Sequence, residues 1–319
     1  MKAVGYTKQG ALEDPDALVD FETERPGAAG HDLLVKVQAV SVNPVDYKIR
    51  NRRPPEGDLP NVIGWDAVGE VVEMGSDAAG FSVGDKVWYA GAINRSGSNA
   101  EYLLVDARIV WKQPSSLAAA SAAALPLTSL TAWEMLFDRL RVTEPVPGGA
   151  NAVVIIGGAG GVGSIAIQLL RAKTDLTVIA TASRPETQAW ARELGAHHTV
   201  DHSQPLAPQI EALGIGAPSF VFSPTHTDSY VEQIAEFIAP QGRFGLIDDP
   251  EALNIAPFKP KSVSIHWELM FTRSLFTTVD IARQGEILNA VAGMIDAGEI
   301  RSTATETAGT INAETLRKA

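Results

Sequence analysis

The stretch of this chain best suited to hold a ligand is a cluster of five glycines within seven residues: Gly157, Gly158, Gly160, Gly161 and Gly163. A glycine turn has no side chains in the way, so its backbone can approach a phosphate closely. An apolar run from Val153 to Ile156 precedes the cluster, and apolar residues at helical spacing follow it from Val162 to Leu170. The order strand, glycine turn, helix predicts a pyrophosphate held at the N-terminus of that helix.

The spacing Gly158-x-Gly160-x-x-Gly163 in this context indicates a dinucleotide site, whereas the alternative is a purely structural glycine turn. We predict that the whole turn contacts the cofactor through Gly158, Ala159, Gly160, Gly161, Val162 and Gly163. Two residues at the ends of later apolar segments, Ser223 and Ile247, are expected to contact it as well.

The end of the next apolar segment predicts which dinucleotide binds. An NAD site usually carries an acidic residue about twenty residues past the glycines, where it accepts a hydrogen bond from the ribose. This chain has Ser183-Arg184 there and no acid before Glu186. A hydroxyl and a guanidinium suit a 2′-phosphate, so we predict NADP(H). The alternative for Arg184 is a solvated charge on a loop.

Composition limits the classes of function. The chain has 319 residues, a net charge of −12 and no cysteine. The negative charge argues against nucleic acid or an anionic membrane as a partner. Without cysteine, disulfides and thiolate metal sites are excluded. No apolar run has the length of a membrane span and the first residues lack a signal peptide, so we expect a cytoplasmic protein.

Two patterns of secondary structure divide the chain. Residues 1–115 contain many short alternating segments separated by glycine turns, without a ten-residue helical pattern, which favours an irregular β-barrel. Beyond residue 117, apolar segments alternate with helical ones, which is typical of a doubly wound parallel sheet in an α/β protein. We predict one domain from residues 1–122 and 257–319, and a dinucleotide-binding domain from 123–256.

Five short motifs resemble the medium-chain dehydrogenase/reductase superfamily, in its order and over most of the chain: Val42-Asn-Pro-Val-Asp46, Gly64-Trp-Asp-Ala-Val-Gly69, Val83-Gly-Asp-Lys-Val87, Ala124-Leu-Pro-Leu-Thr-Ser-Leu-Thr-Ala132 and Gly157-Gly-Ala-Gly-Gly-Val-Gly163. They are most similar to the zinc-independent quinone oxidoreductase branch, the zeta-crystallin-like proteins. Two further segments, 181–187 and 266–276, resemble a bacterial subgroup often labelled zinc-type alcohol dehydrogenase-like.

This resemblance implies a Rossmann domain joined to a GroES-like domain. It also implies hydride transfer from NADPH to a small molecule, either a quinone or an α,β-unsaturated carbonyl. The family's chains continue past a segment like Glu314–Ala319 into a last strand, which this sequence does not include. A homodimer is implied too, and the β-rich segment Ser262–Phe271 is the strand expected to pair across its axis.

The resemblance does not extend to the zinc ligands. At the positions where alcohol dehydrogenases of the family hold catalytic zinc, this chain has Asn43 and Trp65, which supply neither a thiolate nor an imidazole. Asp66 alone cannot hold the ion. We therefore predict no metal.

Three residues are implied as hydrogen-bonding groups near the nicotinamide: Asn43, Tyr47 and Thr128. Each also has a structural explanation, because Asn43 could form a turn, Tyr47 could pack and Thr128 could cap a helix. The tyrosine of the family's quinone reductases aligns with Lys48, so the role of Tyr47 is open. Two other functions remain as alternatives: a cofactor-binding protein with little turnover, and a zinc-type alcohol dehydrogenase.

Overall fold

The computed structural model describes residues 1–10 and 17–319, which form two compact units. The first unit comprises Met1–Leu127 and Phe271–Ala319, and the second comprises Thr128–Met270. The second unit extends further than the expected 123–256, because the strand at Ser264–Trp267 belongs to its sheet.

The second unit is built on a sheet of six parallel strands: β9 (Ala150–Ile155), β10 (Thr177–Thr181), β11 (His198–Val200), β12 (Pro218–Ser223), β13 (Arg243–Leu246) and β14 (Ser264–Trp267). Its helical segments are α3 (Pro126–Trp133, which begins in the first unit), the π-helical η2 (Glu134–Arg139), α4 (Gly161–Lys173), α5 (Pro185–Glu193), α6 (Leu206–Glu211), η3 (Thr227–Ser229), α7 (Val231–Phe237) and η4 (Ala256–Lys261). Pro126 is the first residue of α3, because a proline fits the first helical turn, where no N–H is needed.

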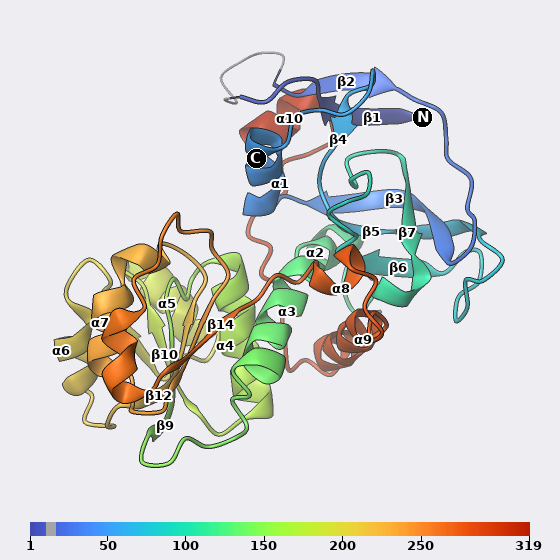
Figure 1. Cartoon of the computed structure of the whole chain (residues 1–319). Coiled ribbons are helices and arrows are strands. Elements are labelled where there is room, and N and C mark those ends of the chain that lie inside the picture. Colours follow the sequence, from blue (N-terminus) through green and yellow to red (C-terminus); the bar gives the residue numbers. More distant parts are fainter. Residues whose placement is uncertain (11–16) are drawn as a thin grey trace. The chain divides into compact units, whose positions relative to one another are not determined.

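The strands lie in the order β11-β10-β9-β12-β13-β14, so the order in which the chain adds them to the sheet reverses between β9 and β12. Four of them, β9, β10, β12 and β14, are labelled in Figure 1. Crossovers between parallel strands are right-handed, so the helices of the two halves cover opposite faces of the sheet. Val154 and Val221 pair across the two central strands and are fully buried. The expected doubly wound parallel sheet is confirmed, and its central strands are continuous apolar runs because both faces are covered.

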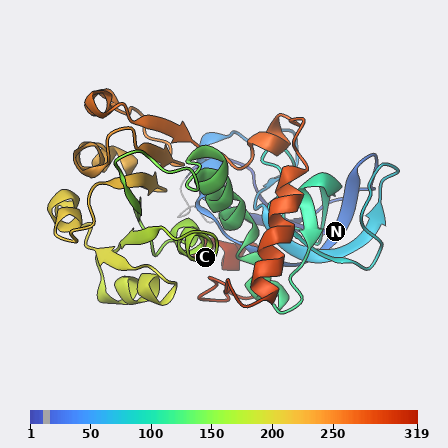
Figure 2. The same cartoon turned by 90° about the horizontal axis from the view of Figure 1, so that it is seen from below.

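The first unit contains two antiparallel sheets (Figure 2). The smaller has the order β2-β1-β4 and the larger β7-β3-β5-β6-β8. Their strands are β1 (Lys2–Tyr6), β2 (Val19–Glu22), β3 (Asp32–Ser41), β4 (Asn61–Val62), β5 (Asp66–Met74), β6 (Lys86–Tyr89), β7 (Tyr102–Asp106) and β8 (Val110–Lys112). The helices are α1 (Pro44–Arg52), η1 (Ala107–Ile109), α2 (Ala119–Ala123), α8 (Thr272–Leu275), α9 (Arg283–Asp296) and α10 (Ala313–Lys318).

Two elements differ from the sequence-based expectations. Helix α1 lies within the region where no long helical pattern is visible, because its buried residues are the polar Asp46 and Arg50 rather than an apolar stripe. The strand expected over Ser262–Phe271 is limited to the four residues of β14. Among the described residues, no helix is both long and apolar enough to cross a bilayer.

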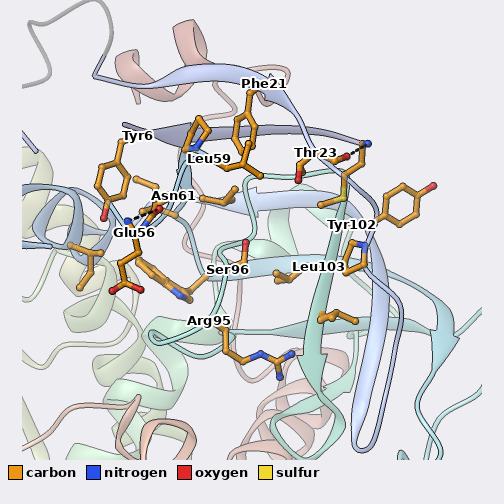
Figure 3. Close-up of a pocket in the computed structure, with 18 of the residues that line it drawn as sticks. Tyr6, Phe21, Thr23, Glu56, Leu59, Asn61, Arg95, Ser96, Tyr102 and Leu103 are labelled. Atoms are coloured by element: carbon orange, nitrogen blue, oxygen red, sulfur yellow. Dashed lines mark hydrogen bonds between the residues drawn. The ribbon is translucent and has the colours of Figure 1, made fainter. Parts of the chain in front are cut away.

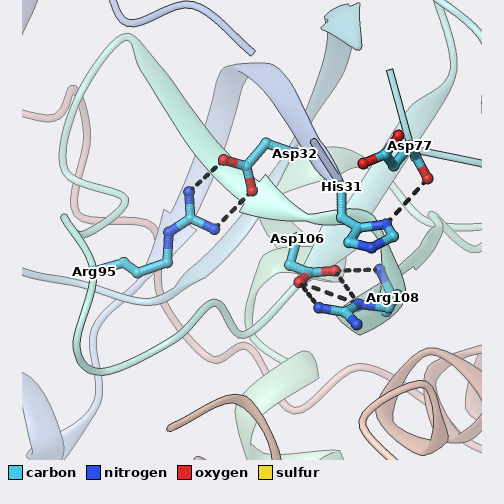
Figure 4. Close-up of polar contacts among 6 residues, drawn as sticks. All are labelled: His31, Asp32, Asp77, Arg95, Asp106 and Arg108. Atoms are coloured by element: carbon cyan, nitrogen blue, oxygen red, sulfur yellow. Dashed lines mark hydrogen bonds and ion pairs between the residues drawn. The ribbon is translucent and has the colours of Figure 1, made fainter. Parts of the chain in front are cut away.

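Charged pairs fix the edge of the larger sheet where β3 begins and β7 ends (Figure 4). Both terminal guanidinium nitrogens of Arg95 donate to the carboxylate of Asp32, at 2.8 Å each. Arg108 donates to both carboxylate oxygens of Asp106 from Nε and Nη2, and Asp106 pairs with Asp32 in the register of β3 and β7. These contacts therefore hold the first residue of β3, whose last residue leads into α1.

Candidate functional site

The glycine turn connects β9 to α4 and presents unused backbone donors. The first hydrogen bond of α4 runs from Ser164 N–H to Gly160 O, at 2.8 Å. The N–H groups of Gly161, Val162 and Gly163 therefore have no acceptor within the helix. Three such donors at the positive end of a 13-residue helix form a suitable site for a phosphate.

The glycines are required by close contacts of the backbone. A Cβ atom added to Gly163 would lie 2.5 Å from Gly157 O, and one added to Gly158 would lie 2.6 Å from the Cβ of Ala180. Any side chain at these positions would push the turn away from the helix or from β10. The space that a phosphate needs is thus kept open by residue type, and the turn fits a dinucleotide.

The next strand holds the turn in place. Gly157 N–H donates to Thr181 Oγ1 at 2.9 Å, and Gly158 N–H donates to Thr181 O at 3.0 Å. The Oγ1 atom of Thr181 also lies within hydrogen-bond distance of His202 Nδ1, at 3.2 Å. Sequence reasoning missed Thr181 and His202, because neither belongs to the glycine motif.

The other predicted cofactor residues follow neighbouring strands. Ser183 is half-buried after β10, and Arg184 is exposed at the start of α5. The guanidinium of Arg184 forms no ion pair within the described part of the chain, so it is available for an anion. The carboxylate nearest in sequence, Glu186, is exposed in the first turn of α5.

Beyond the point where the strand order reverses, between β9 and β12, Ser223 is fully buried at the end of β12. Its hydroxyl lies 2.8 Å from that of Thr227, which donates to Asp248 Oδ1 at 2.6 Å. Ile247 is half-buried directly after β13. The structure thus places all ten predicted cofactor residues at or after the carboxyl ends of β9, β10, β12 and β13, at the reversal of strand order where α/β sheets bind ligands.

Thr128 lies beside the glycine turn. It is 6% exposed in α3, and its methyl group is 3.3 Å from the position that a Cβ on Gly161 would take. Within the second unit, the structure therefore brings this predicted catalytic residue to the first residue of α4.

The other two predicted catalytic residues lie at the start of α1 in the first unit. Asn43 precedes the helix and is buried, whereas Tyr47 is 48% exposed. The side-chain amide of Asn43 donates from Nδ2 to Asp66 Oδ2 at 2.8 Å. Its backbone N–H donates to Asp46 Oδ2 at 3.0 Å, so one asparagine connects two buried carboxylates.

Burial raises the pKa of both carboxyl groups. It raises the pKa of Asp46 to about 7, although the hydrogen bond from the backbone of Asn43 opposes the shift. For Asp66, burial raises the pKa well above its usual value, against hydrogen bonds from Asn43 and Leu127. Sequence reasoning named Asp66 only as an insufficient metal ligand and gave Asp46 no role, because neither the burial of these carboxyl groups nor the contact of Asn43 with Asp66 is visible in the sequence.

A separate hollow of about 830 Å³ lies in the first unit beside the smaller sheet (Figure 3). Tyr6, Phe21 and Tyr102 contribute aromatic walls, and Arg53 and Glu56 contribute charges. None of the predicted site residues lines it, although Ile49 of α1 does.

Two family models match the chain. The alcohol dehydrogenase GroES-like domain matches residues 29–115, which confirms the GroES-like fold expected for the first unit. The zinc-binding dehydrogenase model matches residues 161–283. A zinc-type alcohol dehydrogenase-like protein of Staphylococcus aureus (strain MSSA476), SAS2087, is 38% identical over 323 residues, covering 100% of this chain and 95% of that protein.

Solved structures give the same picture. A Rhizobium etli CFN 42 protein, provisionally named as a zinc-dependent alcohol dehydrogenase, is 59% identical with a TM-score of 0.98 over 100% of this chain and 93% of its own. A quinone oxidoreductase of Pseudomonas syringae is 25% identical, with a TM-score of 0.79 over 94% and 90% of the two chains. The mycobacterial protein Rv1454c, complexed with NADPH, is also 25% identical, with a TM-score of 0.80 over 100% and 95%.

Several of these names imply zinc, but the side chains present here do not fit it. Asn43 and Trp65 take the positions expected for ligands, and both are engaged otherwise: Asn43 with Asp66, and the Trp65 indole N–H with Ala92 O at 3.1 Å. Zinc in proteins is bound by thiolate, imidazole or carboxylate groups. At and beside positions 43 and 65, Asp66 is the only residue that carries one of these groups. Within residues 1–10 and 17–319, no three His, Asp or Glu side chains are grouped to hold a metal ion.

Proposed function

Because this chain belongs to the medium-chain dehydrogenase/reductase superfamily, in its quinone oxidoreductase-like branch, it is an oxidoreductase, and we propose that it uses NADPH to reduce a quinone or an α,β-unsaturated carbonyl. The glycine turn at the reversal of strand order is the observation that carries the proposal. It supports a nicotinamide dinucleotide by donor geometry and by the space that the glycines keep open.

The preference for NADPH is supported by the end of β10. Ser183 and Arg184 offer a hydroxyl and an exposed guanidinium where NAD enzymes place a carboxylate. A 2′-phosphate would gain a charge-assisted hydrogen bond from Arg184 and would meet no repelling acid there. The bound NADPH of the mycobacterial relative agrees with this assignment.

The cofactor supplies the hydride when it is bound, and the residues of the chain have to bind and orient the substrate. We propose three side chains as hydrogen-bond donors to the substrate oxygen on which negative charge develops: the amide of Asn43 and the hydroxyls of Tyr47 and Thr128. Donors fixed by the fold stabilise this charge without reorganising during the reaction. Reduction of a quinone then needs only solvent protons, since the product anion is itself stable.

The direct test is oxidation of NADPH, followed by loss of absorbance, with 9,10-phenanthrenequinone and with a short 2-alkenal. Parallel reactions contain NADH. Turnover with either acceptor is expected, with NADPH preferred over NADH. Binding of NADPH without turnover of either acceptor would instead favour the cofactor-binding protein with little turnover, and equal use of the two cofactors would refute the assignment of Arg184.

The same proposal includes a homodimer through β14. This strand is the last of its sheet, and Trp267 at its end is 58% exposed. If β14 of one copy paired with β14 of a second copy, the free backbone groups of both strands would be hydrogen-bonded and the indole of Trp267 would be covered. Light scattering of the purified protein checks this, and a monomer at micromolar concentration would refute it.

A further inference from the structure

The carboxylate of Asp66 connects two segments that are far apart in the sequence. Ser41 pairs with Asp66 in the register of β3 and β5, so the chain leaving β3 passes Asp66 as it enters α1. Asp66 Oδ2 accepts from Asn43 Nδ2 at 2.8 Å, and Asp66 Oδ1 accepts from the backbone N–H of Leu127 at 2.7 Å. Leu127 lies in the first turn of α3 and immediately precedes Thr128.

A carboxylate is a costly choice at this position. Asp66 is fully buried, and among the described residues it forms no ion pair with a cation. The charge that acts on it most directly is another carboxylate, that of Asp46. An uncompensated buried charge reduces stability, and an asparagine of the same shape would avoid this cost. A purely structural connection between the two segments therefore does not require an acid here.

An acid and an amide at position 66 would differ in their hydrogen-bonding groups: a carboxylate has two acceptor oxygens, whereas an amide has one acceptor oxygen and one NH2 donor. Both carboxyl oxygens of Asp66 accept hydrogen bonds in this structure, Oδ2 from Asn43 and Oδ1 from Leu127, so the Asn43 side chain must turn its Nδ2 toward Asp66. Nδ2 carries two N–H groups, of which Asp66 takes one. The carboxylate therefore fixes the rotation of the Asn43 amide, and the second N–H remains to donate to a ligand.

We propose that Asp66 is a positioning residue of the reductase, which orients the Asn43 amide toward the substrate oxygen and fixes the backbone directly before Thr128. This inference rests on the function proposed above. It assigns Asp66 a role in turnover rather than in cofactor binding, because the glycine turn is built entirely within the second unit.

The test is Asp66→Asn, compared with Asp296→Asn as a matched control. In D66N the introduced amide can still accept from Leu127, but its NH2 group faces Asn43, which must rotate to present its oxygen. Asp296 is also a carboxylate that accepts backbone N–H donors in the first unit, from Ser115 and Ser116, and it has no proposed part in the reaction. We measure kcat with the quinone, the dissociation constant of NADPH, and the melting temperature of each variant.

For D66N we expect kcat to fall on the order of 10²-fold, as for loss of one oriented donor to a developing oxyanion, with NADPH affinity and melting temperature close to wild type. D296N should keep its kcat. The exchange variant N43D/D66N restores a carboxylate–amide pair with the groups reversed, and it should keep a melting temperature close to wild type without regaining kcat.

Wild-type kcat in D66N, or recovery of kcat in the exchange variant, would overturn the role of Asp66 while leaving the proposed function intact. A fall in the kcat of D296N equal to that of D66N would also overturn it, since any loss of structure would then suffice. If the wild-type protein reduces neither acceptor, the proposed function itself fails, and the role of Asp66 fails with it.

Discussion

Asp46 gives the most direct test of the energetics of this site. The residue is 5% exposed, its Oδ2 accepts the N–H of Asn43, and its Oδ1 has no partner in the described part of the chain. Burial raises its pKa from 3.8 to about 7, because that single hydrogen bond only partly compensates for the loss of water. We therefore predict that Asp46→Asn makes the protein more stable, relative to wild type, as the pH rises.

The direction follows from proton binding. Between about pH 4 and pH 7, the folded protein holds a proton on Asp46 that the unfolded chain has released. The stability contributed by this protonated group is complete below the unfolded pKa of 3.8 and is lost as the pH rises through about 7. The interval between these two pKa values corresponds to about 4 kcal/mol in the free energy of unfolding.

An asparagine at position 46 keeps an acceptor for the Asn43 N–H and does not titrate. The difference in unfolding free energy between D46N and wild type should therefore grow by about 4 kcal/mol from pH 4 to pH 8. Asp66 is present in both proteins, so most of its own titration cancels in this difference.

The assay is urea unfolding at a series of pH values, monitored by hydrogen exchange of peptides from β3 and β5. Because both strands belong to the first unit, this readout reports the unfolding free energy of that unit and not of the second. D296N is the control of opposite sign, because hydrogen bonds from Ser116 and Ser115 lower the pKa of Asp296 to about 2. Its loss of stability relative to wild type should be largest above pH 4 and should shrink as the pH falls toward 2. Parallel pH profiles for D46N and wild type would show that the folded pKa of Asp46 is not raised.

Three further predictions concern the cofactor and metal sites. Arg184→Ala should weaken NADPH binding by about 1.5–3 kcal/mol and leave NADH binding unchanged, as measured by cofactor fluorescence; an equal effect on both would contradict a 2′-phosphate contact. Gly163→Ala should abolish measurable binding of either cofactor and destabilise the protein by about 1–3 kcal/mol, because the new methyl group meets Gly157 O. Calorimetric titration and thermal melting check these two effects, and retention of wild-type affinity would refute the close-packed turn. Because Asn43 and Trp65 replace zinc ligands, mass spectrometry should find far less than one zinc per chain, and treatment with EDTA should leave activity intact.

The strand and the glycine turn of the second unit could be predicted from the sequence because the patterns that indicate them are local. A strand buried on both faces needs a continuous apolar run, and β9 has one in Val153, Val154 and Ile155, all fully buried. A turn without room for side chains needs glycine, as at Gly163. These requirements act on residues next to one another, so no knowledge of the rest of the fold is needed to recognise them.

Helix α1 shows where such local reasoning fails. Its sequence, PVDYKIRNR, has no apolar stripe, and the side chains it buries are those of Asp46 and Arg50. The signals that were present, an asparagine before a proline and an acid in the first turn, mark a helix start without revealing that the helix continues. Burial of polar side chains depends on partners that other segments of the chain supply.

The sequence by itself determined the glycine turn, the parallel sheet around it and the residue types available at the end of β10. Only the tertiary structure decided that Asn43, Asp66 and Leu127 meet, because they are separated along the chain: the pairing of β3 with β5 joins Asn43 to Asp66, and a backbone hydrogen bond from the start of α3 adds Leu127. Strand register is a property of two segments together and cannot be read from either one. That register turns an asparagine in a turn and an acid at the start of a strand into one buried hydrogen-bonded cluster.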